Sequence, residues 1–234
     1  MKAQSVVMIG ATGAVGGVVV KTLAAMPQLQ RLTLLGRRPV EGISGAAIAQ
    51  QLVDVFDPAS YAQHLAGHAT AICTLGVGQR AGMSREEFVR IDKTAVLDFA
   101  TACREAGVRH FELLGSVGAD AKSPSFFLRT KGELEDGLRA LGFRRLSLFR
   151  PSMILTPTNR YGVRQAAVLA LWPRLNPLLF GPLRPYRGIA LEALGRAMAN
   201  NISGDKTGVE TLYFDDFVAL SGERGTKQNG AGAV

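Results

Sequence analysis

Four glycines follow the first apolar run of the sequence at a spacing that suits phosphate binding. The segment GATGAVGG, at residues 10–17, lies between an apolar strand pattern and a helical pattern that carries Val18 and Leu23. Residues without a Cβ atom let the backbone turn tightly and approach a pyrophosphate, whose charge is stabilised by amides at the helix N-terminus. Glycines also occur in plain turns, but the strand before, the helix after and a second strand about 20 residues later favour a dinucleotide site. The predicted contacts in this segment are Gly10, Thr12, Gly13, Ala14, Val15 and Gly16.

Two arginines, Arg37 and Arg38, stand at the end of the second predicted strand. A site that selects NAD carries Asp or Glu at this point, to accept hydrogen bonds from the adenosine ribose. Here no carboxylate occurs before Glu41. Guanidinium groups match a 2′-phosphate in charge and in bidentate geometry. The pair therefore predicts NADP(H) as the cofactor, and the alternative is that both arginines simply face solvent.

Asp54 and Val55 follow the third predicted strand. At the carboxyl end of that strand, the Asp54 carboxylate is placed to accept a hydrogen bond from the adenine amine, and Val55 to pack on the adenine ring. The alternative for Asp54 is that it only caps a turn.

The elements that must position these groups alternate short β-branched runs with longer helical patterns. This alternation is typical of βαβ units around a parallel sheet. We therefore predict an α/β fold with a doubly wound parallel sheet and a small C-terminal cap. Strands are expected at 5–9, 31–35, 48–54, 70–75, 110–115 and 145–149.

Helix ends carry their own signals. Asp57 before Pro58 predicts the start of one helix. Ser84 and Glu87 form a capping box ahead of a helix that reaches about Ala106. Further helices are expected from Ser123 or Ser125 to Leu141 and over 191–200, and Tyr213 with Phe214 is expected to form a short strand or turn.

The C-terminal third is basic and rich in proline. Residues 144–206 hold ten Arg or Lys and two acids. We expect one domain over 1–220, with its cap at about 151–190, and a disordered Gly-rich tail over 221–234. Prolines and Arg174 interrupt the apolar stretch at 168–183, so no transmembrane segment is predicted. The arginines and aromatic residues of the cap fit a substrate lid, and the alternative is a surface for a protein partner or a membrane.

Two cysteines, Cys73 and Cys103, are too few for a disulfide framework. Both are expected to fill the core rather than to act as nucleophiles. No paired Cys or His spacing offers a metal site. The N-terminal apolar run is short and leads directly into glycines, which argues against a signal peptide. The predicted location is therefore cytoplasmic.

These motifs resemble the short-chain dehydrogenase/reductase superfamily, in particular its atypical branch with G-A-T-G-x-x-G. Within that branch the sequence is similar to the Tat-interacting-protein-like NADPH-binding group and its bacterial relatives. The resemblance runs from Val6 to about Asn200. It rests on GATGAVGG, LLGRR, VDVFD, CTLG, EEFVRID, HFELLGSVGAD, KGELE and FRPSMIL.

The resemblance implies a Rossmann-like sheet and assigns roles to residues that match. Thr74, Leu75 and Gly76 would line the cofactor after the fourth strand. Ser116 would be the active-site serine, and Lys131 would bind the nicotinamide ribose. Arg150 and Pro151 would lie beside the cofactor, where the substrate-side loop begins.

One position departs from the pattern of the superfamily. In its active members a tyrosine precedes the lysine by four residues, one helical turn, and supplies the proton. This chain has Phe127 there, and none of its four tyrosines lies four residues before a lysine. A phenyl ring cannot transfer a proton, so the acid must be water or another group.

Two functions follow from these residues. The first is an oxidoreductase that uses NADP(H) on a small carbonyl or alcohol, whose identity the sequence does not give. The alternative is a catalytically silent, NADP(H)-binding redox sensor or scaffold that presents its cap to a protein partner. A nucleic-acid or membrane module ranks third, and nucleic acid is not an expected partner.

Overall fold

The structure is a computed structural model that describes residues 3–77, 82–156 and 179–222. Within these residues a central sheet of seven parallel strands has the order β3-β2-β1-β4-β5-β6-β9. The first six strands of this order follow the doubly wound arrangement of dinucleotide-binding folds. The strands are β1 (Gln4–Ile9), β2 (Leu29–Gly36), β3 (Ile48–Leu52), β4 (Thr70–Cys73), β5 (His110–Leu114), β6 (Arg145–Phe149) and β9 (Gly208–Leu212).

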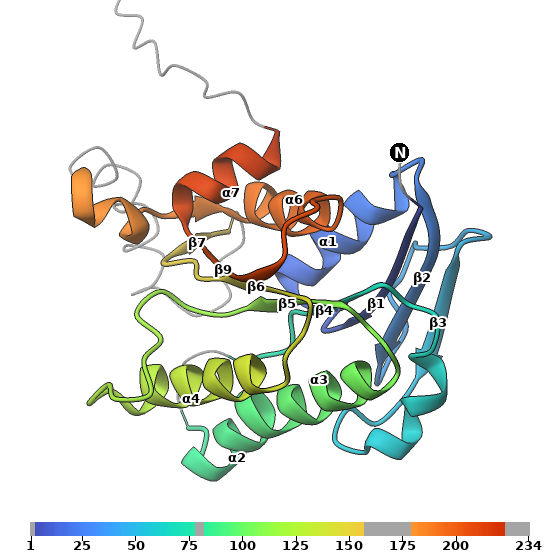
Figure 1. Ribbon diagram of the computed structural model, residues 1–234, viewed down its shortest axis with the longest axis horizontal. Coiled ribbons are helices and arrows are strands. Elements are labelled where there is room, and N and C mark those ends of the chain that lie inside the picture. The colour runs from blue at the N-terminus through green and yellow to red at the C-terminus, as the bar shows by residue number, and fades with distance from the viewer. Residues whose placement is uncertain (1–2, 78–81, 157–178, 223–234) are drawn as a thin grey trace, which may run out of the picture.

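Helices cover both faces of this sheet (Figure 1). On one face lie α1 (Ala14–Ala24), α6 (Leu191–Asn201) and α7 (Phe214–Ser221), and on the other lie α2 (Arg85–Val89), α3 (Ala95–Glu105) and α4 (Phe126–Ala140). Alternate residues of β1 point to opposite faces, so Val6 and Met8 join the core under α1 and α6, while Val7 and Ile9 join the core under α3 and α4. The predicted α/β fold with a Rossmann-like, doubly wound sheet is confirmed.

The six predicted strands agree with the structure to within two residues at either end. The seventh strand, β9, has no counterpart among the predicted strands, because its sequence GVETL mixes polar and apolar residues without alternation and lies at the sheet edge, where Val209 is 53% exposed. The prediction that Tyr213 and Phe214 form a strand or turn was wrong for Phe214, which begins α7. The Asp216 carboxylate accepts a hydrogen bond from the Tyr213 amide at 2.8 Å and so starts that helix.

The long helix predicted after Ser84 consists of α2, a π-helical turn at Arg90–Thr94 and α3. Ser84 caps it by accepting a hydrogen bond from the Glu87 amide at 3.1 Å. At α4 the capping residue is Ser125, whose hydroxyl accepts from the Leu128 amide. After Asp57 the chain forms only two short 3₁₀ turns, Pro58–Ser60 and Ala62–His64.

The C-terminal region contributes a second, two-stranded parallel sheet of β7 (Ile154–Leu155) and β8 (Ile189–Ala190), with a 3₁₀ helix at Gly181–Tyr186. Residues 157–178, which hold most of the predicted cap, lie outside the described residues, as do residues 223–234 of the predicted tail. None of the helices in the described ranges has the length and apolar character needed to cross a membrane.

Candidate functional site

The glycine-rich turn joins β1 to α1 where the end of β4 lies against it. Gly10 has φ +85°, a conformation that L side chains rarely adopt, and a Cβ there would lie 2.5 Å from the Leu75 amide nitrogen. A Cβ on Gly16 would lie 2.2 Å from the Gly10 carbonyl oxygen. The Thr74 hydroxyl donates to that same oxygen at 3.0 Å. The structure therefore brings Thr74 and Leu75 together with the glycine turn, and their contact with a cofactor stays a prediction.

The N-terminus of α1 is open to an anion. Gly13 occupies the N-cap position with an extended backbone, and no side chain caps the helix. The first turn carries no acidic residue, while Thr12 and Gly13 are exposed. Because the first amides of a helix have no partner within the helix, they and the helix dipole favour a bound phosphate. The turn has the shape and the charge that a pyrophosphate requires.

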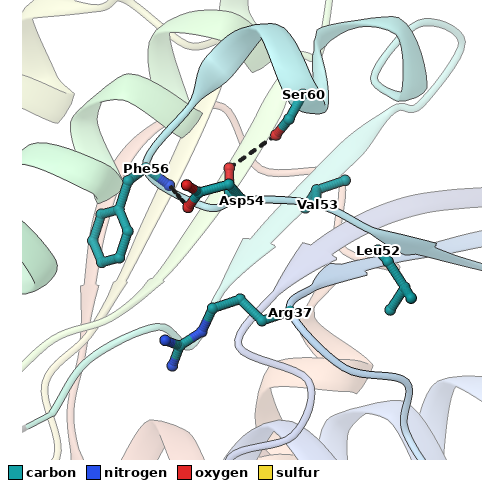
Figure 2. Close-up of a pocket in the computed structure, with 6 residues that line it drawn as sticks. All are labelled: Arg37, Leu52, Val53, Asp54, Phe56 and Ser60. Carbon is teal, nitrogen blue, oxygen red and sulfur yellow. Dashed lines mark hydrogen bonds between the residues drawn. The ribbon is translucent and has the colours of Figure 1, made fainter.

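A pocket of about 480 Å³ opens at the carboxyl ends of β2 and β3. In Figure 2 the Arg37 side chain and the Asp54 carboxylate lie on different sides of this hollow. Arg37 and Arg38 are both exposed, and no carboxylate of the described residues pairs with either of them. The pocket is lined by Arg37, Leu52, Val53, Asp54, Phe56 and Ser60.

Asp54 both faces the pocket and closes a turn. Its Oδ1 accepts a hydrogen bond from the Phe56 amide at 2.9 Å, and its carbonyl accepts one from the Ser60 hydroxyl at 2.9 Å (Figure 2). Asp54 therefore caps a turn in the structure, which is the alternative role that the sequence allows. Val55 is buried and is not among the residues that line the pocket, where Val53 and Phe56 provide the apolar wall.

Lys131 and Asp92 form a buried ion pair behind the loop that follows β4. Lys131 Nζ lies 2.7 Å from Asp92 Oδ1, and their side chains are 6% and 0% exposed. Asp92 Oδ2 accepts a hydrogen bond from the Val77 amide at 2.9 Å. A Cβ on Gly76 would lie 3.0 Å from Asp92 Oδ1 and 3.7 Å from Lys131 Nζ. The lysine of the resemblance thus lies at the same loop as Thr74, Leu75 and Gly76.

Sequence reasoning missed Asp92, although the motif EEFVRID contains it. Asp92 lies in the π-helical turn, where one extra residue per turn shifts the face that each side chain presents. A signal was available, because Phe88 and Val96 flank Asp92 at intervals of four residues and both are buried. A carboxylate on the apolar stripe of a helix indicates a buried partner.

Ser116 lies half-buried in the loop after β5, and α4 holds this loop closely. A Cβ on Gly132 would lie 2.1 Å from the Ala121 amide nitrogen, so the loop backbone touches the helix beside Lys131. Phe127, one turn before Lys131, packs on the Phe88 ring with the two centroids 5.6 Å apart. The side chain that replaces the expected phenol is therefore held in an aromatic contact with α2.

The Arg150 side chain forms hydrogen bonds within the protein. Its Nε donates to Oε1 of buried Glu135 on α4 at 2.9 Å, and this hydrogen bond raises the pKa of Arg150. The Pro151 carbonyl accepts a hydrogen bond from the Val117 amide at 2.9 Å. The structure thus brings Arg150 and Pro151 to α4 and to the loop of Ser116. Their predicted contact with the cofactor stays a prediction.

Both cysteines are free and fully buried. Burial raises the pKa of the Cys73 thiol to about 12 and that of Cys103 well above its usual value. Because the thiolate is the reactive form, neither side chain is suited to nucleophilic chemistry.

The sequence matches the family described as NAD(P)H-binding over residues 10–143. Protein HTATIP2 of Rattus norvegicus is 36% identical over 157 residues, which cover 66% of this chain and 64% of the rat protein. The mitochondrial protein fmp52 of Emericella nidulans is 35% identical over 155 residues, 64% of this chain and 66% of that protein. The chain thus spans slightly less than two thirds of the length of these curated relatives.

Solved structures support the fold. MoeE5 in complex with UDP-glucuronic acid and NAD is similar with a TM-score of 0.69 and 17% identity, covering 89% of this chain and 75% of that chain. The Bordetella bronchiseptica enzyme WbmH in complex with NAD+ is similar with a TM-score of 0.65 and 13% identity, covering 90% and 75%. At such identities the likeness shows a shared fold.

The predicted cytoplasmic location is contradicted by these relatives. The fungal FMP52 proteins, including that of Candida albicans at 30% identity, are named as mitochondrial. The prediction rested on two unpaired cysteines and a short N-terminal apolar run. Free thiols indicate a reducing environment and do not distinguish one reducing compartment from another.

Proposed function

We infer that this chain, which belongs to the NAD(P)H-binding family and to the atypical short-chain dehydrogenase/reductase group, binds NADP(H) in preference to NAD(H) and is an oxidoreductase. The observation that carries the preference is the exposed Arg37 side chain in the pocket at the end of β2, with Arg38 beside it in sequence. Neither guanidinium is neutralised by a carboxylate of the described residues. Both are therefore free to bind a 2′-phosphate.

The residues of the glycine turn fit the remainder of such a cofactor. Gly10 and Gly16 let the turn pack closely on itself and on the end of β4, and α1 presents open amides. Asp54 keeps a second carboxylate oxygen for the adenine amine after Oδ1 has bonded the Phe56 amide.

Lys131 is the group that we expect to hold the nicotinamide ribose. An ammonium carries three donor hydrogens, and its ion pair with Asp92 Oδ1 at 2.7 Å lacks hydrogen-bond geometry, so these hydrogens can donate to ribose hydroxyls. Asp92 fixes the direction of the ammonium because its other oxygen is itself held by the Val77 amide. The lysine is thereby oriented before any ligand arrives.

When bound, the cofactor supplies or accepts the hydride exchanged with the carbon of a small carbonyl or alcohol. Ser116 donates a hydrogen bond to the substrate oxygen, and its present acceptor, the Val117 carbonyl at 3.3 Å, is a weak competitor. Water or another group supplies the proton, because Phe127 cannot. General acid catalysis is typically worth about 10² to 10⁴ in rate, so we expect slow turnover.

The test of cofactor choice is a titration of nucleotide-free protein with NADPH and NADH, followed by cofactor fluorescence. We expect NADPH to bind at least about tenfold more tightly, and Arg37→Ala and Arg38→Ala to remove most of that preference. Arg31→Ala is the matched control, since Arg31 is exposed near the opposite end of β2 and donates to the Ala66 carbonyl. Equal affinity of the natural protein for the two cofactors would refute the proposed preference.

A second function, a catalytically silent NADP(H)-binding sensor or scaffold, is favoured by the packing of Phe127 on Phe88. NADPH oxidation over a panel of small carbonyls separates the two functions, with Phe127→Tyr compared with the natural chain. Activity in the natural protein excludes the silent scaffold. Activity only in the tyrosine variant indicates that the site is intact and lacks its acid.

A further inference from the structure

Gln50, in the middle of β3, closes the loop that carries the two arginines. Its Oε1 accepts a hydrogen bond from the Val40 amide at 2.7 Å, and its Nε2 donates to the Val40 carbonyl at 3.2 Å. The same Nε2 donates to the Ile43 carbonyl at 2.9 Å. One side chain thus satisfies three backbone groups of the segment between β2 and β3, which has no strand of its own to pair with.

These contacts define a short loop with Arg37 and Arg38 at its tip. The segment leaves the sheet at Gly36, whose carbonyl accepts a hydrogen bond from the Val53 amide at 3.0 Å. It comes back at Val40, which Gln50 binds. Only residues 37–39 lie between the two anchors, and Pro39 further restricts the backbone of Arg38.

We propose that Gln50 is a positioning residue for cofactor choice: by fixing Val40 and Ile43, it holds Arg37 and Arg38 where they receive the 2′-phosphate. This inference rests on the proposed preference for NADP(H). Long arginine side chains lose conformational freedom when they bind an anion, so a loop already held in place reduces the entropy cost of that step. The effect of Gln50 is therefore specific to the phosphorylated cofactor.

Val40 and Ile43 also pack their side chains on the core under α1, so apolar contacts hold the loop to the sheet without Gln50. What Gln50 adds is directional, because hydrogen bonds to three backbone groups fix the orientation of the peptide planes. Loss of Gln50 should consequently loosen the tip of the loop and leave the fold in place.

The chain offers a matched control in Gln51. It has the same side chain on the same strand, but successive residues of a strand face opposite sides of the sheet. Among the described residues the side-chain amide of Gln51 forms no hydrogen bond. Gln50→Met removes all three hydrogen bonds with little change in volume, and Gln51→Met makes the same chemical change without touching the loop.

The experiment measures the binding of two probes that differ only in the 2′-phosphate, adenosine 2′,5′-bisphosphate and 5′-AMP, by calorimetry. We expect Gln50→Met to weaken the bisphosphate by about tenfold and 5′-AMP by less than about twofold, with Gln51→Met like the natural chain. Gln50→Asn, whose amide is one methylene too short to reach Val40, should behave as Gln50→Met does. Circular dichroism and thermal melting establish that each variant is folded.

The outcomes separate the two proposals. If Arg37→Ala and Arg38→Ala weaken bisphosphate binding while both Gln50 variants bind as the natural chain does, the role of Gln50 is overturned and the NADP(H) preference stands. If the natural chain binds both probes equally well, the preference fails and the role of Gln50 fails with it. Equal weakening of both probes by Gln50→Met would also overturn the inference, since it would reveal a general structural effect.

Discussion

Asp92 and Lys131 connect three segments that are far apart in the sequence: the loop after β4, the π-helical turn before α3, and α4. The two charged atoms lie 2.7 Å apart, and neither side chain is more than 6% exposed. Charges removed from water to this degree are retained only when each satisfies the other. The pair therefore ties the orientation of the lysine to the position of the loop beside the glycine turn.

Asp92→Asn should destabilise the protein strongly, because it leaves the Lys131 ammonium buried without a counter-charge. We expect a loss of about 3 to 5 kcal/mol in the free energy of unfolding, measured with urea. Lys93→Met is the matched control, since Lys93 and Glu133 join the same two helical segments at 2.7 Å but remain 30% and 39% exposed. Exposed pairs contribute about 0 to 1 kcal/mol. Similar losses in the two variants would contradict the importance of the buried pair.

A buried polar cluster under α6 should make stability depend on pH. Burial raises the pKa of Glu112 to about 8 from 4.5, and burial lowers the pKa of His110 to about 3 from 6.5. Both side chains are therefore neutral in the folded protein near pH 7, so their contact at 3.5 Å is not an ion pair. The Asn201 amide donates to Glu112 Oε1 at 2.8 Å, and Glu112 Oε2 has no hydrogen-bond partner among the described residues.

The direction of the effect follows from which state keeps the proton. Between pH 4.5 and 8 the unfolded chain loses the Glu112 proton while the folded protein retains it, so stability falls as the pH rises through this range. His110 acts in the opposite sense, since the unfolded chain gains its proton below pH 6.5 and stability falls as the pH decreases.

Glu112→Gln should flatten the alkaline part of this profile, because glutamine stays neutral and still accepts from Asn201. Well above pH 6.5 most unfolded-state His110 is already neutral, so the slope there reports mainly Glu112. We expect the free energy of unfolding of the natural chain, measured with urea, to fall by ~1 kcal/mol between pH 6.5 and 8, because His110 offsets part of the loss from Glu112. The variant should lose far less, and parallel profiles of the two proteins would reject this assignment.

Gly132→Ala should displace the loop that carries Ser116. The added Cβ would lie 2.1 Å from the Ala121 amide nitrogen and 2.2 Å from the Asp120 carbonyl carbon, and backbone atoms cannot move aside cheaply. We expect destabilisation of about 1 to 3 kcal/mol, read from chemical denaturation. On the same helix, Gly137→Ala meets only the flexible end of Leu97 and gains helix propensity, so it should be close to neutral. Loss of stability in the second variant alone would show that the loop does not lie against Gly132.

Local sequence patterns were sufficient for six of the seven strands of the central sheet, because β-branched runs and capping residues act within a few positions of where they stand. Arg145–Phe149 was predicted to the residue. β9 escaped prediction because contacts remote in sequence hold it: Arg145 and Ser147 on β6 donate to the Glu210 carboxylate at 2.8 and 2.6 Å. The five residues of β9 carry no sequence pattern that indicates those partners.

The residues of the candidate site also fall into those that local sequence patterns predict and those that depend on contacts remote in sequence. The glycine turn and Arg37 lie within a strand-turn-helix and a strand end, which the sequence displays directly. Asp92 and Gln50 act on backbone or side chains brought to them by the fold. The spacing of Asp92 from Phe88 and Val96 indicates a buried carboxylate, but the partners of both residues could be found only from the structure.

Gly16 and Gly17 provide the sharpest test of the glycine turn, because adjacent residues of the same type meet different surroundings. A Cβ on Gly16 would lie 2.2 Å from the Gly10 carbonyl oxygen, whereas a Cβ on Gly17 has only the Ala11 carbonyl oxygen, at 3.9 Å. We expect Gly16→Ala to abolish measurable binding of NADPH in fluorescence titrations, since the turn must open to admit the methyl group. Gly17→Ala should bind NADPH normally and melt at the same or a slightly higher temperature, because alanine favours the helix. Undiminished cofactor binding in Gly16→Ala would show that the turn is not the phosphate cradle.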